Sequence, residues 1–483
     1  MTYSAIIIGT GFSGLAMAIK LKERGIHNFL ILEKATEIGG TWRENTYPGA
    51  ECDVPSALYS YSFEPYPDWE YKWSHQPQIL RYLKYCVQKY ELYPHIRFGQ
   101  KLVAATWEND AKIWQVETAD GSIFQTKNLI TAVGQLHYPS TPNFKGKDTF
   151  QGEIFHSAKW NHDLDLSNKT IGVIGNAASA VQFIPEIAEK AKKIVVFQRS
   201  ANWLLPKQDR LYQQWEKNLV RRFPFILKLY RLKIWLLGGA LFLMMKNGNN
   251  WLRNFYQWQS KRYIRREIDD PILQKKLIPK YPMGAKRLLF SDNYYTALNR
   301  ENVEVLTGGI DEITESGVIL KNSNSQPLDI LIYSTGFKTN PFLMGLQLVG
   351  RDGLTIQNAW KDSPKNYLGM TVSGFPNFFI MYGPNTNLGH NSIILMSEAQ
   401  AKYIAECIFE MGKKDWQSLE VKPEIVEQYD TEIQARLSKM IWATIGNSWY
   451  QSANGNIPNN FPGRTMEYRR RTRKVDFSEY LIE

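Results

Sequence analysis

Three glycines near the N-terminus have the spacing of a turn that binds a dinucleotide. Gly9, Gly11 and Gly14 form a GxGxxG pattern between an apolar, β-prone run, Ala5–Ile8, and a helix-like segment. Glycine permits the tight turn and lets backbone amides approach a pyrophosphate at the positive end of the helix. Glu33 closes the next predicted strand, where a carboxylate can accept hydrogen bonds from both ribose hydroxyls. These four residues predict a dinucleotide site.

A second turn of the same design follows a second apolar strand, and it departs from the glycine pattern. The run from Gly175 to Ala180 reads GNAASA, so that Ala177 replaces the second glycine and Ala180 the third. We expect Gly175, Asn176, Ser179 and Ala180 to surround a second pyrophosphate, although the Ala177 methyl could push it away. The alternative is a relic of the fold that no longer binds a nucleotide.

The strand after this second turn ends differently from its counterpart. It closes on Gln198-Arg199-Ser200, where a site for NADH would carry an acidic residue. A carboxylate would repel a 2′-phosphate, whereas Arg199 can form charge-assisted hydrogen bonds to it, with Ser200 beside it. The sequence therefore favours NADPH over NADH.

Five other segments carry side chains that could do chemistry. Gly40, Thr41 and Trp42 form a flexible turn followed by a hydroxyl and a large ring, suited to pack along a flavin. The other four candidates each have a purely structural explanation as the alternative to a functional role. Asp53 could be a solvated loop carboxylate and His156 a structural histidine. Lys286 with Arg287 could be a solvent-facing basic pair, and Asn385 a plain helix cap.

Composition excludes several classes of protein. The aromatic and apolar content is too high for a disordered chain. Cys52, Cys86 and Cys407 are not spaced as a redox dithiol, so a disulfide reductase is not expected. The net charge of +11 is spread over basic pairs and does not predict nucleic-acid binding. The chain enters a strand at once, without a signal sequence, which favours a cytoplasmic protein.

Strand and helix patterns place these residues in an α/β fold with two Rossmann-like dinucleotide-binding domains. The segments 128–134 and 329–336 both read as strands that end in small-residue turns, as where a chain crosses between two such domains. We expect a first domain at 1–145 and 341–483, a second at 146–210 and 280–340, and a helical insertion at 211–279.

The apolar run Ile234–Met245 inside this insertion is too short to span a bilayer. We expect a buried helix or a lid on the substrate pocket, with peripheral membrane contact as the alternative.

The ensemble resembles the Baeyer–Villiger monooxygenases, which are class B flavoprotein monooxygenases. The run from Phe150 to Trp160 (FxGxxxHxxxW) is similar to the fingerprint of that family. The GGTW and NxYPGxxxD segments, the Lys286-Arg287 pair, GPNTNLGHNS and SWYxxxxG are similar to it as well. Flavin-containing monooxygenases that oxidise nitrogen or sulfur share the two glycine turns, but their fingerprint usually ends in Tyr or Phe where Trp160 stands. These nitrogen- and sulfur-oxidising enzymes are the alternative family.

The resemblance implies FAD in the first site, NADPH in the second, and oxygen insertion beside a ketone carbonyl through a peroxyflavin. A thioether or an amine is the alternative substrate. Arg287 is then expected to keep the peroxide anionic, Asp53 to hold Arg287, and His156 to act indirectly by coupling the two domains. Tyr59, Val103 and Asn385 complete the expected cofactor contacts. No metal, no nucleic-acid partner and at most peripheral membrane contact are expected, and the oligomeric state is left open.

Overall fold

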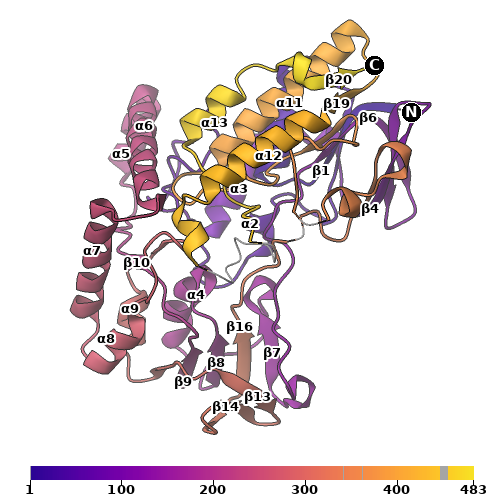
Figure 1. Cartoon of the computed structure of the whole chain (residues 1–483). Coiled ribbons are helices and arrows are strands. Elements are labelled where there is room, and N and C mark those ends of the chain that lie inside the picture. Colours follow the sequence, from indigo (N-terminus) through magenta and orange to yellow (C-terminus); the bar gives the residue numbers. More distant parts are fainter. Residues whose placement is uncertain (1, 341, 362, 446–454) are drawn as a thin grey trace.

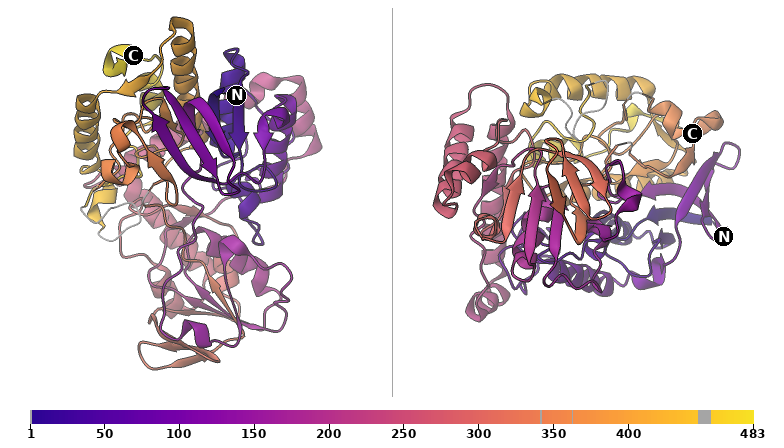
Figure 2. Two further views of the ribbon diagram at one scale, coloured as in Figure 1. Left: turned by 90° about the vertical axis from the view of Figure 1, so that its right-hand side faces the viewer. Right: turned by 90° about the horizontal axis from the view of Figure 1, so that it is seen from below.

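The computed structural model describes residues 2–340, 342–361, 363–445 and 455–483. Two large sheets organise the chain, one in the upper part of the molecule and one in the lower part (Figure 1). Figure 2 shows the same two parts from the side and from below. The expected α/β fold with two dinucleotide-binding units is therefore present.

The first sheet has eight strands in the order β17-β4-β5-β6-β1-β2-β3, with β18 paired to β6. Its strands are β1 (Thr2–Ile8), β2 (Phe29–Leu32), β3 (Ile96–Arg97), β4 (Leu102–Glu108), β5 (Ile113–Thr118), β6 (Ile123–Thr131), β17 (Gln347–Val349) and β18 (Phe378–Ile380). Alternate residues of β1 enter different cores: Ala5 and Ile7 pack under the helices, whereas Ile6 and Ile8 face the antiparallel strands. This is the period of two that a strand imposes.

The second sheet is parallel throughout, in the order β12-β9-β8-β16-β7. Its strands are β7 (Glu153–His156), β8 (Thr170–Ile174), β9 (Lys193–Phe197), β12 (Val303–Leu306) and β16 (Ile330–Tyr333). The smaller sheets are β10 (Leu204–Leu205) with β11 (Leu289–Phe290), β13 (Ile310–Thr314) with β14 (Gly317–Leu320) and β15 (Ser325–Pro327), and β19 (Leu419–Val421) with β20 (Tyr480–Ile482). We propose that the chain divides at the domain limits expected from the sequence, with one large sheet in each of the two domains.

Helices cover both sheets and form the insertion. They are α1 (Phe12–Glu23), α2 (Thr41–Glu44), α3 (Gln76–Lys89), α4 (Ala178–Ala188), α5 (Gln214–Arg222), α6 (Pro224–Leu241), α7 (Trp251–Glu267), α8 (Pro271–Leu277), α9 (Tyr294–Leu298), α10 (Ile356–Ala359), α11 (Ile394–Lys414), α12 (Pro423–Leu437) and α13 (Thr465–Arg471). The short 3₁₀ helices are η1 (Tyr93–His95), η2 (Lys147–Thr149), η3 (Ser157–Lys159), η4 (Phe242–Met245), η5 (Arg351–Gly353), η6 (Ile441–Thr444) and η7 (Phe477–Glu479).

The insertion differs from the sequence expectation in one respect. Its helices α5 to α8 lie along one side of the molecule (Figure 1). In the apolar run, Phe242, Met244 and Met245 are buried, but Leu236 and Leu237 are 57% and 59% exposed. The expectation of a buried helix is therefore wrong for the first half of the run, because only the opposite side of α6 packs on the protein. Among the described residues, no helix combines the length and apolar character needed to cross a bilayer.

Candidate functional site

A single continuous cavity of about 1390 Å³ runs between the two large sheets. It is larger than the pocket of a drug-sized ligand, roughly 300–1,000 Å³, and so has room for more than one cofactor group. Most of the residues singled out from the sequence line it: Gly9, Gly11, Glu33, Gly40, Thr41, Trp42, Asp53, Tyr59, Gly175, Asn176, Ser179, Arg199, Ser200, Lys286 and Arg287. The structure thus brings both glycine turns and the basic pair to one space.

The first glycine turn has the conformation that a pyrophosphate site requires. Gly9 has φ +104°, and a Cβ placed on it would lie 2.8 Å from the Ala132 carbonyl oxygen at the end of β6. A Cβ on Gly14 would lie 2.0 Å from the Gly9 carbonyl oxygen, so that Gly14 permits the close packing of α1 although it does not line the cavity. The backbone conformation at Gly9 and the close packing at Gly14 therefore require glycine at both positions.

The second turn repeats this geometry in the second sheet. Gly175 has φ +103°, and its Cβ would lie 2.3 Å from the Ser334 carbonyl oxygen after β16. Ala177 occupies the position that corresponds to Gly11, where a Cβ would meet only the Gly40 Cα at 3.8 Å. The backbone of the first turn thus leaves space for a methyl at Gly11, the position where the second turn carries alanine. Ala180 is fully buried in α4 and does not line the cavity.

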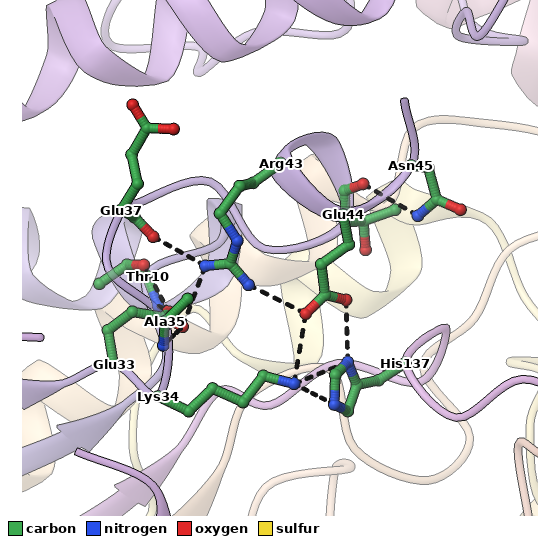
Figure 3. Close-up of polar contacts among 10 residues, drawn as sticks. Thr10, Glu33, Lys34, Ala35, Glu37, Arg43, Glu44, Asn45 and His137 are labelled. Carbon is green, nitrogen blue, oxygen red and sulfur yellow. Dashed lines mark hydrogen bonds and ion pairs between the residues drawn. The ribbon is translucent and has the colours of Figure 1, made fainter. Parts of the chain in front are cut away.

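Glu33 directly follows β2, as expected, but the protein itself already supplies its carboxylate with hydrogen-bond donors (Figure 3). One carboxylate oxygen accepts hydrogen bonds from the Thr10 amide at 3.0 Å and the Thr10 hydroxyl at 2.6 Å. The other accepts from the Ala35 amide and from Arg43 Nη1, each at 3.0 Å. Glu33 therefore fixes the first glycine turn, and a ribose hydroxyl would have to share or replace one of these donors.

Beside Glu33 lies a charged cluster that the sequence did not reveal. Arg43 also donates to Glu44 at 2.9 Å, and Glu44 accepts from His137 Nδ1 at 2.8 Å (Figure 3). Lys34 contacts both Glu44, at 3.2 Å, and His137. Burial opposes ionisation of Glu44, but His137, Lys34 and Arg43 together lower its pKa. All four residues line the cavity, and no local motif joins them, because they come from three separate segments.

Asp53 and Arg287 form a two-point ion pair in the cavity wall. The Arg287 Nε donates to Asp53 Oδ2 at 2.6 Å, and Nη2 donates to Oδ1 at 2.8 Å. The Asp53 loop is held against α4, because Gln182 Oε1 accepts from the Tyr47 hydroxyl at 2.8 Å and its amide donates to the Glu51 carbonyl at 3.0 Å. The pair therefore joins a loop of the first unit to the strand β11 region of the second.

Lys286 extends toward the second glycine turn. Its ammonium donates to the Ser200 hydroxyl at 3.0 Å, directly after β9, and lies 4.6 Å from the centre of the Tyr281 ring. Burial, and then the positive charge of Arg199, lower the Lys286 pKa. Two cations thus converge beside Ser200, which is the arrangement that a phosphate dianion would stabilise.

Trp42 and Tyr59 form a wall on the side of the first glycine turn. The indole Nε1 of Trp42 donates to the Tyr59 hydroxyl at 3.1 Å, and the two rings meet edge to face with their centres 5.6 Å apart.

Tyr382 is a further aromatic residue of the cavity that the sequence did not single out. Its hydroxyl donates to the Asn387 side chain at 2.9 Å. Burial raises the pKa of Tyr382 to about 12, a shift that the nearby Arg287 opposes.

Besides Gly14 and Ala180, three of the expected site residues do not line the cavity. Val103 lies in β4, and its neighbour Leu102 provides the contact instead. Asn385 is buried, and its amide donates to the carbonyls of Ile457 and Asn460, so it ties two loops together and does not cap α11. His156 ends β7, accepts a hydrogen bond from the Ala158 amide at 3.0 Å, and has a pKa lowered by burial.

Two other expectations concern sulfur and the C-terminal loop. Cys52, Cys86 and Cys407 are free and buried, and burial raises the pKa of each thiol. The SWYxxxxG segment begins at residue 448 and lies largely outside the described residues.

Three comparisons relate this chain to known proteins. Residues 6–221 match the family described as "Pyridine nucleotide-disulphide oxidoreductase". A Baeyer–Villiger monooxygenase of Pseudomonas aeruginosa is 39% identical over 99% of this chain and 90% of its own length. Another, of Streptomyces coelicolor, is 37% identical over 99% and 92%. The solved structure of OTEMO in complex with FAD and NADP covers 100% of this chain and 99% of its own, with 29% identity and a TM-score of 0.89.

Identity at this level over nearly the full length of both chains, together with the paired glycine turns, shows the family. The chain belongs to the Baeyer–Villiger monooxygenases, a group of class B flavoprotein monooxygenases.

Proposed function

We propose that this chain oxygenates a small ketone with NADPH and dioxygen and releases an ester or a lactone. One oxygen atom enters the bond beside the carbonyl, and the other leaves as water with the hydride of NADPH and one proton. The observation that carries the proposal is the Asp53–Arg287 ion pair in the wall of a cavity that both glycine turns share.

The first turn and its surroundings fit FAD. Gly9, Gly11 and Gly14 leave the backbone open where the pyrophosphate would lie, and Glu33 fixes that turn. The expected flavin contacts that line the cavity beside it are Gly40, Thr41, Trp42 and Tyr59. Bound FAD supplies the acceptor for the nicotinamide hydride and the group that activates dioxygen. Val103 and Asn385 would support this site indirectly, from behind the cavity wall.

The second turn and its basic neighbours fit NADPH. Gly175, Asn176 and Ser179 line the cavity at the start of α4. Arg199, Ser200 and Lys286 gather after β9, where the 2′-phosphate of NADPH would lie. Their positive charge would hold that phosphate, which NADH lacks. Ala180 would keep α4 packed behind the pyrophosphate.

Arg287 would hold a positive charge at the place where negative charge develops on oxygen during attack on the ketone carbonyl. Arginine stays ionised under all working conditions, so the charge does not depend on pH. Asp53 is a positioning residue, because its two hydrogen bonds orient the guanidinium plane. His156 would act indirectly, through the edge contact of its ring with Phe337, which lines the cavity.

A substrate panel tests this function directly. The purified enzyme with FAD and NADPH would be incubated with cyclic, long-chain and aryl ketones and with thioethers, under isotopically labelled dioxygen. We expect at least one ketone to yield an ester or lactone that carries one labelled oxygen. Sulfoxide without any ester would show a heteroatom oxygenase instead. NADPH oxidation that yields only hydrogen peroxide with every compound would overturn the proposal.

A further inference from the structure

Helix α6 presents an exposed apolar stripe to solvent. Phe225, Leu229, Leu232 and Leu236 follow one another at intervals of four, three and four residues, which places them on one helix face. Each is between 47% and 59% exposed. Single exposed leucines are common, but four in register on one helix are the sign of a contact surface.

The opposite face of α6 is fixed to the body of the molecule. Arg231 is buried and donates to the Ser60 hydroxyl at 2.6 Å and to the Ser60 carbonyl at 3.2 Å. Trp235 donates to the Thr465 hydroxyl at 2.8 Å, and its own carbonyl accepts from Asn391 at 3.1 Å. Because this inner face is already packed, the leucine stripe cannot turn inward, and it faces solvent as a property of the fold.

Helix α7 lies on the same side of the molecule as α6 (Figure 1). It carries a second exposed apolar stripe. Trp251, Phe255 and Trp258 lie at intervals of four and three residues, and Trp251 is 78% exposed. Arg262 continues this face, with its guanidinium carbon 5.6 Å from the centre of the Trp258 ring. Tryptophan beside arginine is the side-chain combination that favours the interface between lipid headgroups and acyl chains.

The charge of this segment is one-sided. Between Glu216 and Glu267 the sequence contains no Asp or Glu and twelve Lys or Arg: Lys217, Arg221, Arg222, Lys228, Arg231, Lys233, Lys246, Arg253, Lys261, Arg262, Arg265 and Arg266. Only Arg231 and Arg253 among them are buried. Exposed Lys228 and Lys233 flank the leucine stripe on α6. An apolar stripe between cations on a helix fits the surface of an anionic bilayer.

We propose that the outer faces of α6 and α7, here called the insertion face, bind the surface of an anionic phospholipid membrane. The leucines enter the acyl boundary, while the lysines and arginines meet the headgroup phosphates. A second copy of the chain is a poorer occupant, because two such faces would repel each other. A nucleic acid would satisfy the cations but leave the leucine stripe in water. We propose a cytoplasmic location for this chain, and there the inner leaflet of the cell membrane supplies the anionic lipid.

The proposal goes beyond the proposed oxygenation and does not depend on it. Vesicle flotation of the holoenzyme would compare phosphatidylcholine alone with phosphatidylcholine mixed with phosphatidylglycerol. We expect binding to the mixed vesicles and little to the neutral ones, with a decline as NaCl rises from about 0.05 M to about 0.5 M. No binding to mixed vesicles at low salt would overturn the proposal.

Two variants locate the contact. Leu229→Gln, Leu232→Gln and Leu236→Gln together should lower the partition coefficient at least about a hundredfold. Lys228→Glu with Lys233→Glu should lower it about tenfold or more at low salt. The matched controls are Ile123→Gln, at a position 65% exposed at the start of β6, and Lys127→Glu on the same strand. Both controls should bind as the wild type does.

NADPH-dependent reduction of the flavin should stay unchanged in all four variants, because none of these residues lines the cavity. Equal loss of vesicle binding in the controls would contradict the assignment to the insertion face. So would a wild-type dimer that the leucine variant converts to a monomer, since this would make a second copy the occupant. Binding to DNA in preference to mixed vesicles would also overturn it.

Discussion

Lys286 and Arg287 are adjacent in the chain, yet each serves a different part of the cavity. The Lys286 ammonium donates to Ser200 behind the second glycine turn, whereas the Arg287 guanidinium donates twice to Asp53 in the loop of the first unit. One dipeptide therefore spans the space between the two expected cofactors. Changes at the two positions should consequently have separable effects, on coenzyme choice and on oxygenation.

Removal of the cations beside Ser200 should erode the preference for NADPH. One charge-assisted hydrogen bond contributes about 1.5–3 kcal/mol, so Arg199→Ala should reduce the NADPH-to-NADH ratio of kcat/KM about tenfold or more. Lys286→Ala should act in the same direction. The control is Arg300→Ala, an exposed arginine outside the cavity. Equal use of both coenzymes by the wild-type enzyme would refute the assignment.

A substitution in one glycine turn should impair the binding of one cofactor and leave the binding of the other unchanged. Gly9→Ala places a Cβ 2.8 Å from the Ala132 carbonyl oxygen at a positive φ, and should abolish retention of FAD. Gly175→Ala, with 2.3 Å to the Ser334 carbonyl oxygen, should leave FAD bound and weaken NADPH binding. Flavin absorbance of the purified variants and titration with NADPH distinguish the two. Loss of FAD from both variants, or from neither, would contradict the separate assignment of the sites.

Ala177→Gly tests whether the departure from the glycine pattern matters. Glycine restores the usual approach of backbone to pyrophosphate but costs roughly 0.5–1 kcal/mol of backbone entropy at the start of α4. Because Ala177 is exposed and lines the cavity, we expect its change to glycine to leave the fold intact and to tighten NADPH binding modestly. Weaker binding in the same titration would show that the alanine is adapted to its neighbours.

The sequence predicted the features that neighbouring residues determine and missed the contacts between residues that are far apart in the chain. Both glycine turns sit between a strand and a helix, so their spacing alone indicated their role. The strand expected to close at Gln198-Arg199-Ser200 is β9, which ends at Phe197. The Glu44–His137 contact joins residues 93 positions apart, and no short motif records it. Asp53 and Arg287 are 234 positions apart, and only the resemblance to a family suggested the pair. The exposed side of α6 was missed because composition does not say which helix face packs inward.

His390 should make the fold sensitive to acid. Burial, and then the charge of Arg464, lower its pKa from about 6.5 to about 3. The unfolded chain therefore binds one more proton, and the free energy of unfolding should fall by about 1.4 kcal/mol per pH unit as the pH drops from 6.5 toward 3. His390→Leu should flatten this dependence in urea unfolding followed between about pH 7 and about pH 5. His27→Leu, at an exposed histidine, is the control and should not; an unchanged slope in His390→Leu would show that another group carries the acid sensitivity.

The central claim is that Arg287 serves oxygenation and not hydride transfer, and Arg287→Ala separates the two half-reactions. Loss of one preorganised electrostatic partner typically costs about 2.7–4 kcal/mol, a factor of roughly a hundred to a thousand. We predict that the variant still binds FAD and is still reduced by NADPH in anaerobic stopped-flow experiments. In air it should form almost no ester, and the oxygen that it consumes should appear as hydrogen peroxide.

Arg287→Lys, which keeps the charge but loses the two-point contact with Asp53, should fall between wild type and Arg287→Ala in ester formation. The decisive measurement is the ratio of ester to hydrogen peroxide per NADPH oxidised by Arg287→Ala, set beside its anaerobic rate of flavin reduction. A collapsed ratio with near wild-type reduction is the predicted result. Ester formation at near wild-type rate, or an equal collapse of flavin reduction, would contradict the role assigned to Arg287.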